Sequence, residues 1–188
     1  MKRPGWRAWA WATCLCVAGL GGGARAQGPA GAPLERSVKA AFLYKFLSYT
    51  EFPPNAFSDA AAPVVIGVAD ADELAAELGR IVAGRSVNNR PLVVRTLHEG
   101  DAPSGIQLLF VGGSDGARVA RLLRAAAPAP MLVVSEADNG LQQGSVINFK
   151  VIAERVRFDV SLEAADRNNV KLSSRLLTVA NHVSRGAP

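Results

Sequence analysis

The residues best placed to do chemistry lie in the stretch LLFVGGSDGARVARLL, residues 108–123. Within it, Gly112, Ser114 and Gly116 follow the pattern G-x-S-x-G, the turn that presents a nucleophilic serine in hydrolases. The context also fits, because an apolar, strand-like run precedes the turn and a helix-like run follows it. Ser114 is therefore either a nucleophile or the N-cap of a helix.

A nucleophilic Ser114 needs an acid and a histidine. Glu136 or Asp138, directly after another apolar run, and then His182 give the Ser, acid, His order of α/β-hydrolases. His182, however, falls on the polar side of the predicted C-terminal helix, where it would be solvated instead of aimed at the serine. His98 comes before the serine and breaks the order. The sequence thus supplies the motif without a well-placed base.

Helix capping explains the same stretch without catalysis. Serine is a preferred N-cap, and Asp115 in the first turn complements the helix dipole. Phosphate binding by the turn is the other alternative, but the spacing G-x-G-x-x-G and a P-loop lysine are absent from this stretch. We therefore reject Ser114 as a nucleophile and predict no catalytic residue.

The N-terminus predicts a secretory signal peptide over residues 1–26. Three basic residues precede the apolar run AWAWATCLCVAGL, and ARA at 24–26 has the small-x-small form that signal peptidase accepts. We expect cleavage between Ala26 and Gln27. The apolar run is short for a membrane span, so the mature chain is expected to be soluble in the periplasm.

Loss of the signal changes the chemistry open to the mature chain. The signal carries four of the 21 basic residues and no acidic one, so 17 basic and 16 acidic residues remain, a formal charge of +1. A nearly neutral chain gives no electrostatic reason to bind nucleic acid. Both cysteines leave with the signal, and His98 and His182 are too few for a zinc cluster. We predict no metal and no cofactor.

The remaining sequence predicts one α/β domain over residues 35–185, after a flexible lead-in over 27–34. Continuous apolar runs predict buried strands, and a helical repeat between them predicts crossovers. The apolar runs lie at 64–69, 108–112 and 131–135, and a further strand is expected at 91–97. Alternation then predicts an antiparallel hairpin turning at Ala153 and Glu154, and a closing helix over 172–183. The fold class is a three-layer domain: a mixed, mostly parallel sheet with helices packed on it and an antiparallel C-terminal hairpin.

The first predicted helix, which starts at Leu34 and is stopped by Pro53, is apolar nearly all round. One apolar stripe suits a core under the sheet, and a second stripe must be covered by the same core or by another protein. We expect the second stripe to contribute to a partner or dimer interface. The candidate residues for this interface are Leu43, Tyr44, Leu47 and Phe52.

Five segments of the chain resemble one family. They are VKAAFLYKFLSYTEFP (38–53), GRSVNNRPLVVRTL (84–97), LLFVGGS (108–114), GSVINF (144–149) and RVRFDVSLEAADRNNVKLSSRLLTVANHV (155–183). In this order they resemble the YfiR-like family of periplasmic proteins. The likeness spans nearly the whole mature chain, and the last block is its most specific part.

The resemblance implies a regulatory, non-enzymatic protein. Members repress a membrane diguanylate cyclase by binding its periplasmic sensor domain, an outer-membrane lipoprotein relieves the repression, and members can dimerise. A related sensor kinase is an alternative partner, and a small serine hydrolase using Ser114 or a periplasmic small-ligand binding module are alternative functions. The known repressors carry disulfide-forming cysteines, which this mature chain lacks, so redox control does not transfer.

Overall fold

The structure, a computed structural model of the 188-residue chain, describes residues 31–113, 115–126 and 129–185. The predicted signal peptide, its cleavage between Ala26 and Gln27, and Ser114 lie outside the described residues. The helices are α1 (Gly31–Ser48), the short 3-10 helix η1 (Pro54–Ala56), α2 (Asp72–Val82), α3 (Gly116–Ala126), α4 (Leu162–Arg167) and α5 (Ser174–Val179). The strands are β1 (Thr50–Glu51), β2 (Val64–Ala69), β3 (Ser86–Val87), β4 (Arg90–Leu97), β5 (Leu108–Val111), β6 (Leu132–Ser135), β7 (Ile147–Ile152), β8 (Arg155–Ser161), β9 (Lys171–Leu172) and β10 (His182–Ser184).

Eight strands form one mixed sheet in the order β10-β8-β7-β6-β5-β2-β4-β3. The five central strands from β7 to β4 run parallel, β3 and β8 are antiparallel to their neighbours β4 and β7, and β10 runs parallel to β8. Of these strands, β2, β5 and β6 are buried on both faces, which is why their sequences read as continuous apolar runs, whereas β4 alternates between exposed and half-buried residues. The predicted fold class is confirmed.

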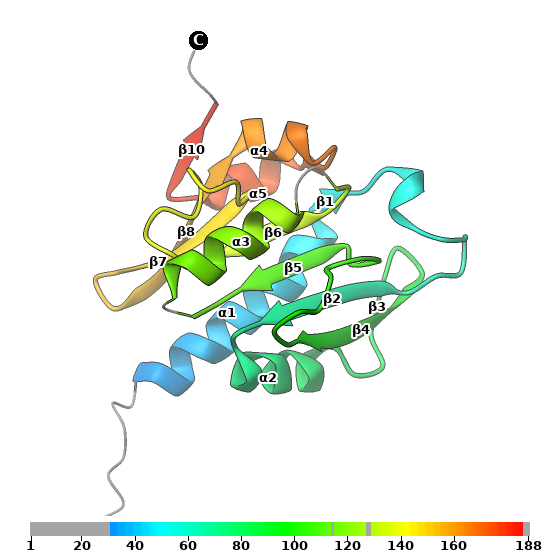
Figure 1. Ribbon diagram of the computed structural model, residues 1–188, viewed down its shortest axis with the longest axis horizontal. Helices are drawn as coiled ribbons and strands as arrows, with labels where there is room; N and C mark the ends of the chain where they lie inside the picture. Colours follow the sequence, from blue (N-terminus) through cyan, green and yellow to red (C-terminus); the bar gives the residue numbers. More distant parts are fainter. Residues whose placement is uncertain (1–30, 114, 127–128, 186–188) are drawn as a thin grey trace, which may run out of the picture.

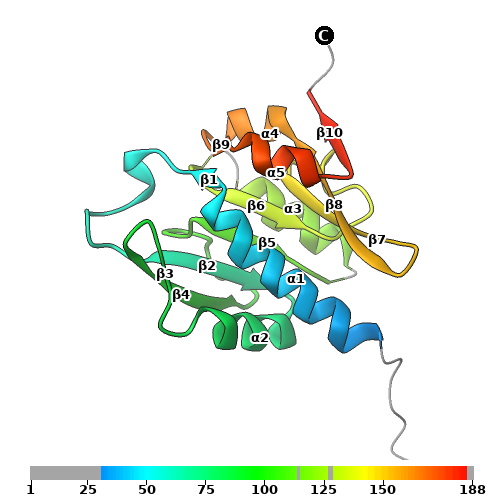
Figure 2. The ribbon, with the colours of Figure 1, turned by 180° about the vertical axis from the view of Figure 1, so that it is seen from behind.

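The helices form one layer on each face of the sheet. On one face α1 crosses the sheet beside α2, and on the other face lies α3 (Figures 1 and 2). Phe42 and Phe46 of α1 pack on Phe149 of β7 and Phe158 of β8, with ring centroids 4.9 Å apart for Phe46 and Phe158. This aromatic cluster ties the N-terminal helix to the C-terminal hairpin.

The first helix has different ends from those predicted. It begins at Gly31, so residues 31–34 of the expected flexible lead-in are helical. It ends at Ser48, and Thr50 and Glu51 instead pair with Leu172 and Lys171 of β9. The pairing with β9 accounts for the early end, because Pro53 restricts only Phe52 directly before it.

The C-terminal segment also differs from the prediction. The structure has a helix only over Ser174–Val179, after which Ala180 is extended and His182 begins β10. Register places His182 beside Asp159 of β8. Residues 182–184 form a strand instead of the end of a long helix, because pairing with the edge strand β8 satisfies their backbone N–H and C=O groups.

Candidate interaction surface

The turn that holds the G-x-S-x-G pattern lies at the switch point of the sheet. The crossover through α2 leads from β2 to β4 on one side, and the crossover through α3 leads from β5 to β6 on the other. Ligands of α/β proteins bind outside the carboxyl ends of strands at such a point. Gly112 lets the turn after β5 approach the turn after β2, since a Cβ on Gly112 would lie 3.0 Å from the Cβ of Ala71. Gly113 has a φ of +86°, which favours glycine.

Asp115 caps the helix that follows this turn. Its Oδ1 accepts hydrogen bonds from the backbone N–H groups of Ala117 at 3.0 Å and Arg118 at 3.1 Å. The sequence predicts Asp115 in the first turn of the helix. In the structure Asp115 is instead the N-cap of α3. Arg118 then donates to Asp70 at 2.6 Å, which ties the helix to the end of β2.

The structure does not bring the expected triad partners together. Glu136 follows β6 and accepts a hydrogen bond from Lys39 at 2.6 Å, while Asp138 is exposed. His182 is exposed on β10, and strands β7 and β8 separate it from β6. His98 is exposed beyond β4, on the other side of the sheet. Over the described ranges, neither histidine forms an ion pair with Glu136 or Asp138.

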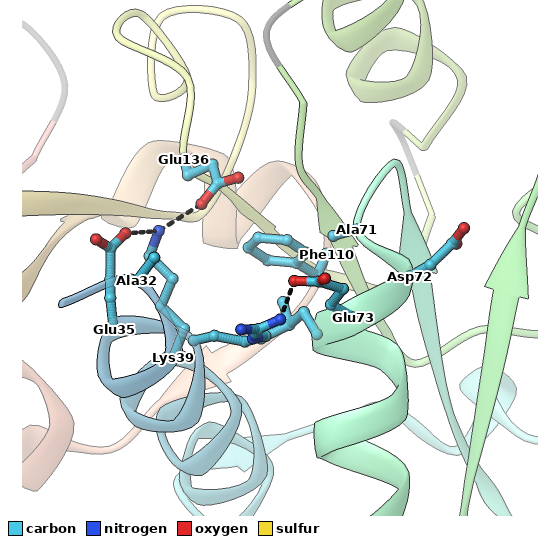
Figure 3. Close-up of a pocket in the computed structure, with 10 residues that line it drawn as sticks. Ala32, Glu35, Lys39, Ala71, Asp72, Glu73, Phe110 and Glu136 are labelled. Carbon is cyan, nitrogen blue, oxygen red and sulfur yellow. Dashed lines mark hydrogen bonds and ion pairs between the residues drawn. The ribbon is translucent and has the colours of Figure 1, made fainter. Parts of the chain in front are cut away.

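Ion pairs cross the crevice at the switch point. A pocket of about 310 Å³ lies between the start of α1 and the turn after β2, beside Phe110 (Figure 3). Lys39 reaches from α1 to Glu136 and also binds Glu35, and Arg36 binds Glu73. Burial lowers the pKa of Lys39, but the hydrogen bonds and charges of Glu136 and Glu35 outweigh it and raise the pKa overall. The Arg36 pair thus joins α1 to α2, and the Lys39–Glu136 pair joins α1 to the segment after β6.

Metal chemistry finds no support in this crevice or elsewhere in the described part of the chain. Among those residues, no group of three His, Cys, Asp or Glu side chains is arranged to hold a metal ion. Three of the four carboxylates that line the crevice, those of Glu35, Glu73 and Glu136, are paired with Lys39 or Arg36. The crevice therefore holds ion pairs that link α1 with α2 and with the segment after β6.

The four predicted interface residues divide into two pairs. Leu43 and Leu47 are fully buried, because α1 packs on both the sheet and α2 and its second stripe is covered within the chain. The prediction is therefore corrected for these two residues, which are core. Tyr44 and Phe52 are half-buried and keep some exposed surface. Phe52 packs edge-on against Phe57, with ring centroids 6.2 Å apart.

A different apolar surface surrounds the β7–β8 hairpin. Strand β7 continues past the end of its pairing with β6, and strand β8 begins before its pairing with β10. The hairpin therefore projects from the sheet (Figure 1). Four large apolar side chains around it are exposed by 43 to 67%, and we call them the hairpin surface. They are Leu34, Val151, Ile152 and Val179.

Two grooves flank this hairpin. One of about 850 Å³ lies between the hairpin and the start of α1 and is lined by Leu34, Phe42 and Val151 among others. One of about 410 Å³ lies on the opposite face, between Ile152 and Val179. The sequence held a signal for this surface: Val151 and Ile152 are adjacent, so they point to opposite faces and one buried face cannot cover both.

Asp159 fixes the base of the hairpin. Its side chain is 4% exposed and accepts hydrogen bonds from Lys150 at 2.6 Å and from Asn181 at 2.7 Å. Burial raises the pKa of Asp159, but the hydrogen bonds from Asn181 and Lys150 and the nearby charges of Lys150 and His182 lower it overall. The carboxylate therefore links β7, β8 and the segment leading into β10.

The fold and the surface define a three-layer α/β domain that presents an apolar hairpin flanked by grooves. The sequence profile of the YfiR/HmsC-like family matches residues 36–181. The chain belongs to the YfiR/HmsC-like family. This family is regulatory rather than catalytic, and it is periplasmic.

A solved structure supports the fold. A conserved domain protein from Vibrio cholerae O1 biovar El Tor aligns with a TM-score of 0.54 and 12% identity, over 79% of this chain and 60% of the other. The present chain thus spans less than two thirds of that protein. No curated protein sequence matches the chain. Over the ranges that the structure covers, no helix is long and apolar enough to cross a membrane.

Proposed function

We propose that the protein is an exported regulator that represses a membrane diguanylate cyclase by binding its periplasmic sensor domain. The family match over residues 36–181 carries the proposal. Binding lowers the output of cyclic-di-GMP, and an outer-membrane lipoprotein that sequesters the regulator restores it. A related sensor kinase is the alternative partner.

The hairpin surface is the part of the described chain best suited to this contact. Its four apolar side chains lie beside two grooves, and exposed apolar patches of this kind mark sites of protein association. The crevice at the switch point is less suitable, because the ion pairs of Lys39 and Arg36 cross it. Tyr44 and Phe52 lie outside the hairpin surface and remain the other interface candidates.

Gene deletion followed by complementation tests the proposal. Deletion is expected to raise cellular cyclic-di-GMP and biofilm matrix, and the unaltered gene should restore the low level. The variant Val151→Asp with Ile152→Asp should fail to restore it, since two charges would enter the apolar contact. Val93→Asp is the matched control, because Val93 is also an exposed valine, 45% accessible, but lies on β4.

One result would contradict the repressor role, and another would contradict only the assignment of the hairpin surface. Unchanged cyclic-di-GMP after deletion, with no cyclase or kinase crosslinked to the protein in the periplasm, would remove the repressor role. Full complementation by the hairpin variant would leave the role intact but exclude the hairpin surface. Circular dichroism of both variants must match the unaltered protein, so that a loss of function reports binding and not folding.

A further inference from the structure

The outer edge of β8 is only partly covered by another strand. β10 pairs with Asp159, Val160 and Ser161, whereas Arg155–Arg157 has no neighbouring strand on that side in the described part of the chain. The carbonyl of Phe158 accepts a hydrogen bond from the Asn181 N–H at 2.8 Å, so this residue faces the β10 side. Val156, two residues earlier on an alternating strand, directs its N–H and C=O toward the same edge.

The side chains at this edge alternate in chemistry as well as direction. Arg155 and Arg157 are exposed, and within the residues that the structure describes neither guanidinium forms an ion pair. Val156 between them points to the opposite face, where it packs beside the aromatic cluster and lines the 850 Å³ groove. The edge thus presents cation, apolar and cation in succession, beside an unpaired backbone.

A second copy of the chain does not suit this edge. Antiparallel pairing of two such edges about Val156 would place Arg155 of one copy opposite Arg157 of the other. Like charges directly opposite in a sheet are destabilising. An occupant with acidic side chains at those two positions would instead form ion pairs across the ladder.

We infer that the outer edge of β8 at Arg155–Arg157 binds an extended segment of a protein partner by strand addition. The segment carries an apolar side chain between two acidic ones. Its backbone pairs with Val156, its acidic side chains meet the two arginines, and its apolar side chain enters the groove beside Leu34. The inference rests on the proposed binding role and specifies the partner's chemistry.

Fluorescent hexapeptides test the edge directly. (Glu-Val)₃ and (Lys-Val)₃ are titrated against the protein at low ionic strength, with anisotropy as the readout. We expect the acidic peptide to bind about tenfold more tightly than the basic one. Two glutamates would form partly exposed ion pairs with Arg155 and Arg157, whereas two lysines would be repelled by these arginines. Raised salt should narrow the difference.

Charge reversal provides the controls. Arg155→Glu with Arg157→Glu should reverse the preference, whereas Arg121→Glu with Arg124→Glu, on the exposed face of α3, should leave it unchanged. Val156→Pro removes the edge N–H and should weaken binding of both peptides. Circular dichroism spectra must match the unaltered protein for each variant.

Three outcomes would overturn the inference. Equal affinity for the two peptides would show that the arginines do not select an occupant. Unchanged affinity of the Arg155→Glu, Arg157→Glu variant for (Glu-Val)₃ would place binding elsewhere. A dimer in sedimentation that this variant disrupts would assign the edge to a second copy. In each case the proposed repressor role stands if gene deletion still raises cyclic-di-GMP, so the two failures are distinguishable.

Discussion

Replacement of Asp159 by asparagine is expected to destabilise the protein by about 2 kcal/mol at pH 7. The side chain is 4% exposed and accepts two hydrogen bonds, from Asn181 and from Lys150. A buried hydrogen bond to a charged group contributes about 1.5 to 3 kcal/mol, but Lys150 is 46% exposed, so its share is reduced by solvent to about 1 kcal/mol or less. Asparagine keeps the shape of the side chain and removes its charge.

The loss of stability caused by Asp159→Asn must depend on pH. The pKa of Asp159 is lower in the folded protein than in the unfolded chain, where it is about 3.9. The carboxylate therefore contributes its full stability above that unfolded value and loses it as the pH falls through the folded pKa. The difference in unfolding free energy between the unaltered protein and Asp159→Asn should be constant from pH 7 to about pH 5 and shrink below about pH 4.

Urea unfolding followed by far-UV circular dichroism measures this difference. Tryptophan fluorescence does not report on the α/β domain, because all three tryptophans fall within residues 1–26, before the domain begins. Asp166→Asn is the matched control, since Asp166 is exposed on α4 and should change stability little. A difference below about 0.5 kcal/mol at pH 7, or one that is the same at pH 7 and pH 3, would refute the reasoning.

Three further predictions concern packing, the crevice and the serine. Gly67→Ala places a Cβ in steric conflict with Cδ1 of Ile106 and should cost about 1 to 3 kcal/mol in urea unfolding, and Ile106→Val, which lacks that atom, should recover part of the loss; strict additivity of the two changes would contradict the clash. Lys39→Met leaves Glu35 and Glu136 without their shared cation and should lower stability by about 1 to 2 kcal/mol at pH 7 in urea unfolding; an unchanged unfolding free energy would contradict this. A fluorophosphonate probe should not label the protein, and labelling that disappears in Ser114→Ala would restore the hydrolase hypothesis.

The central sheet could be predicted because its signals are local. Val64–Ala69 is a strand with the bounds expected, since an apolar run between turn residues fits a strand buried on both faces. The hairpin turn is also confirmed: Ala153 and Glu154 have φ of 48° and 60°, as a two-residue turn between alternating strands requires. The short strand Ser86–Val87 was not predicted, although the Asn88–Asn89 turn after it is typical of a hairpin.

The edges of the fold depend on distant partners and could not be predicted in the same way. Periodicity alone extends the last helix to Val183, because only pairing with β8 shows that His182 is in a strand. Likewise, the apolar character of Leu43 does not say whether α2 or another protein covers it. The interface prediction was wrong for Leu43 and Leu47 for that reason. The sequence does not predict the exposure of Val151 and Ile152, because how far the hairpin projects depends on where its neighbours β6 and β10 end.

The aromatic cluster between α1 and the β7–β8 hairpin also determines when the chain can fold. Phe42 and Phe46 lie near the start of the domain, while Phe149 and Phe158 lie near its end. Contacts between such distant segments form late, since the whole intervening chain must be available before they can close. Nearly all of the domain must therefore be synthesised before this aromatic cluster can form.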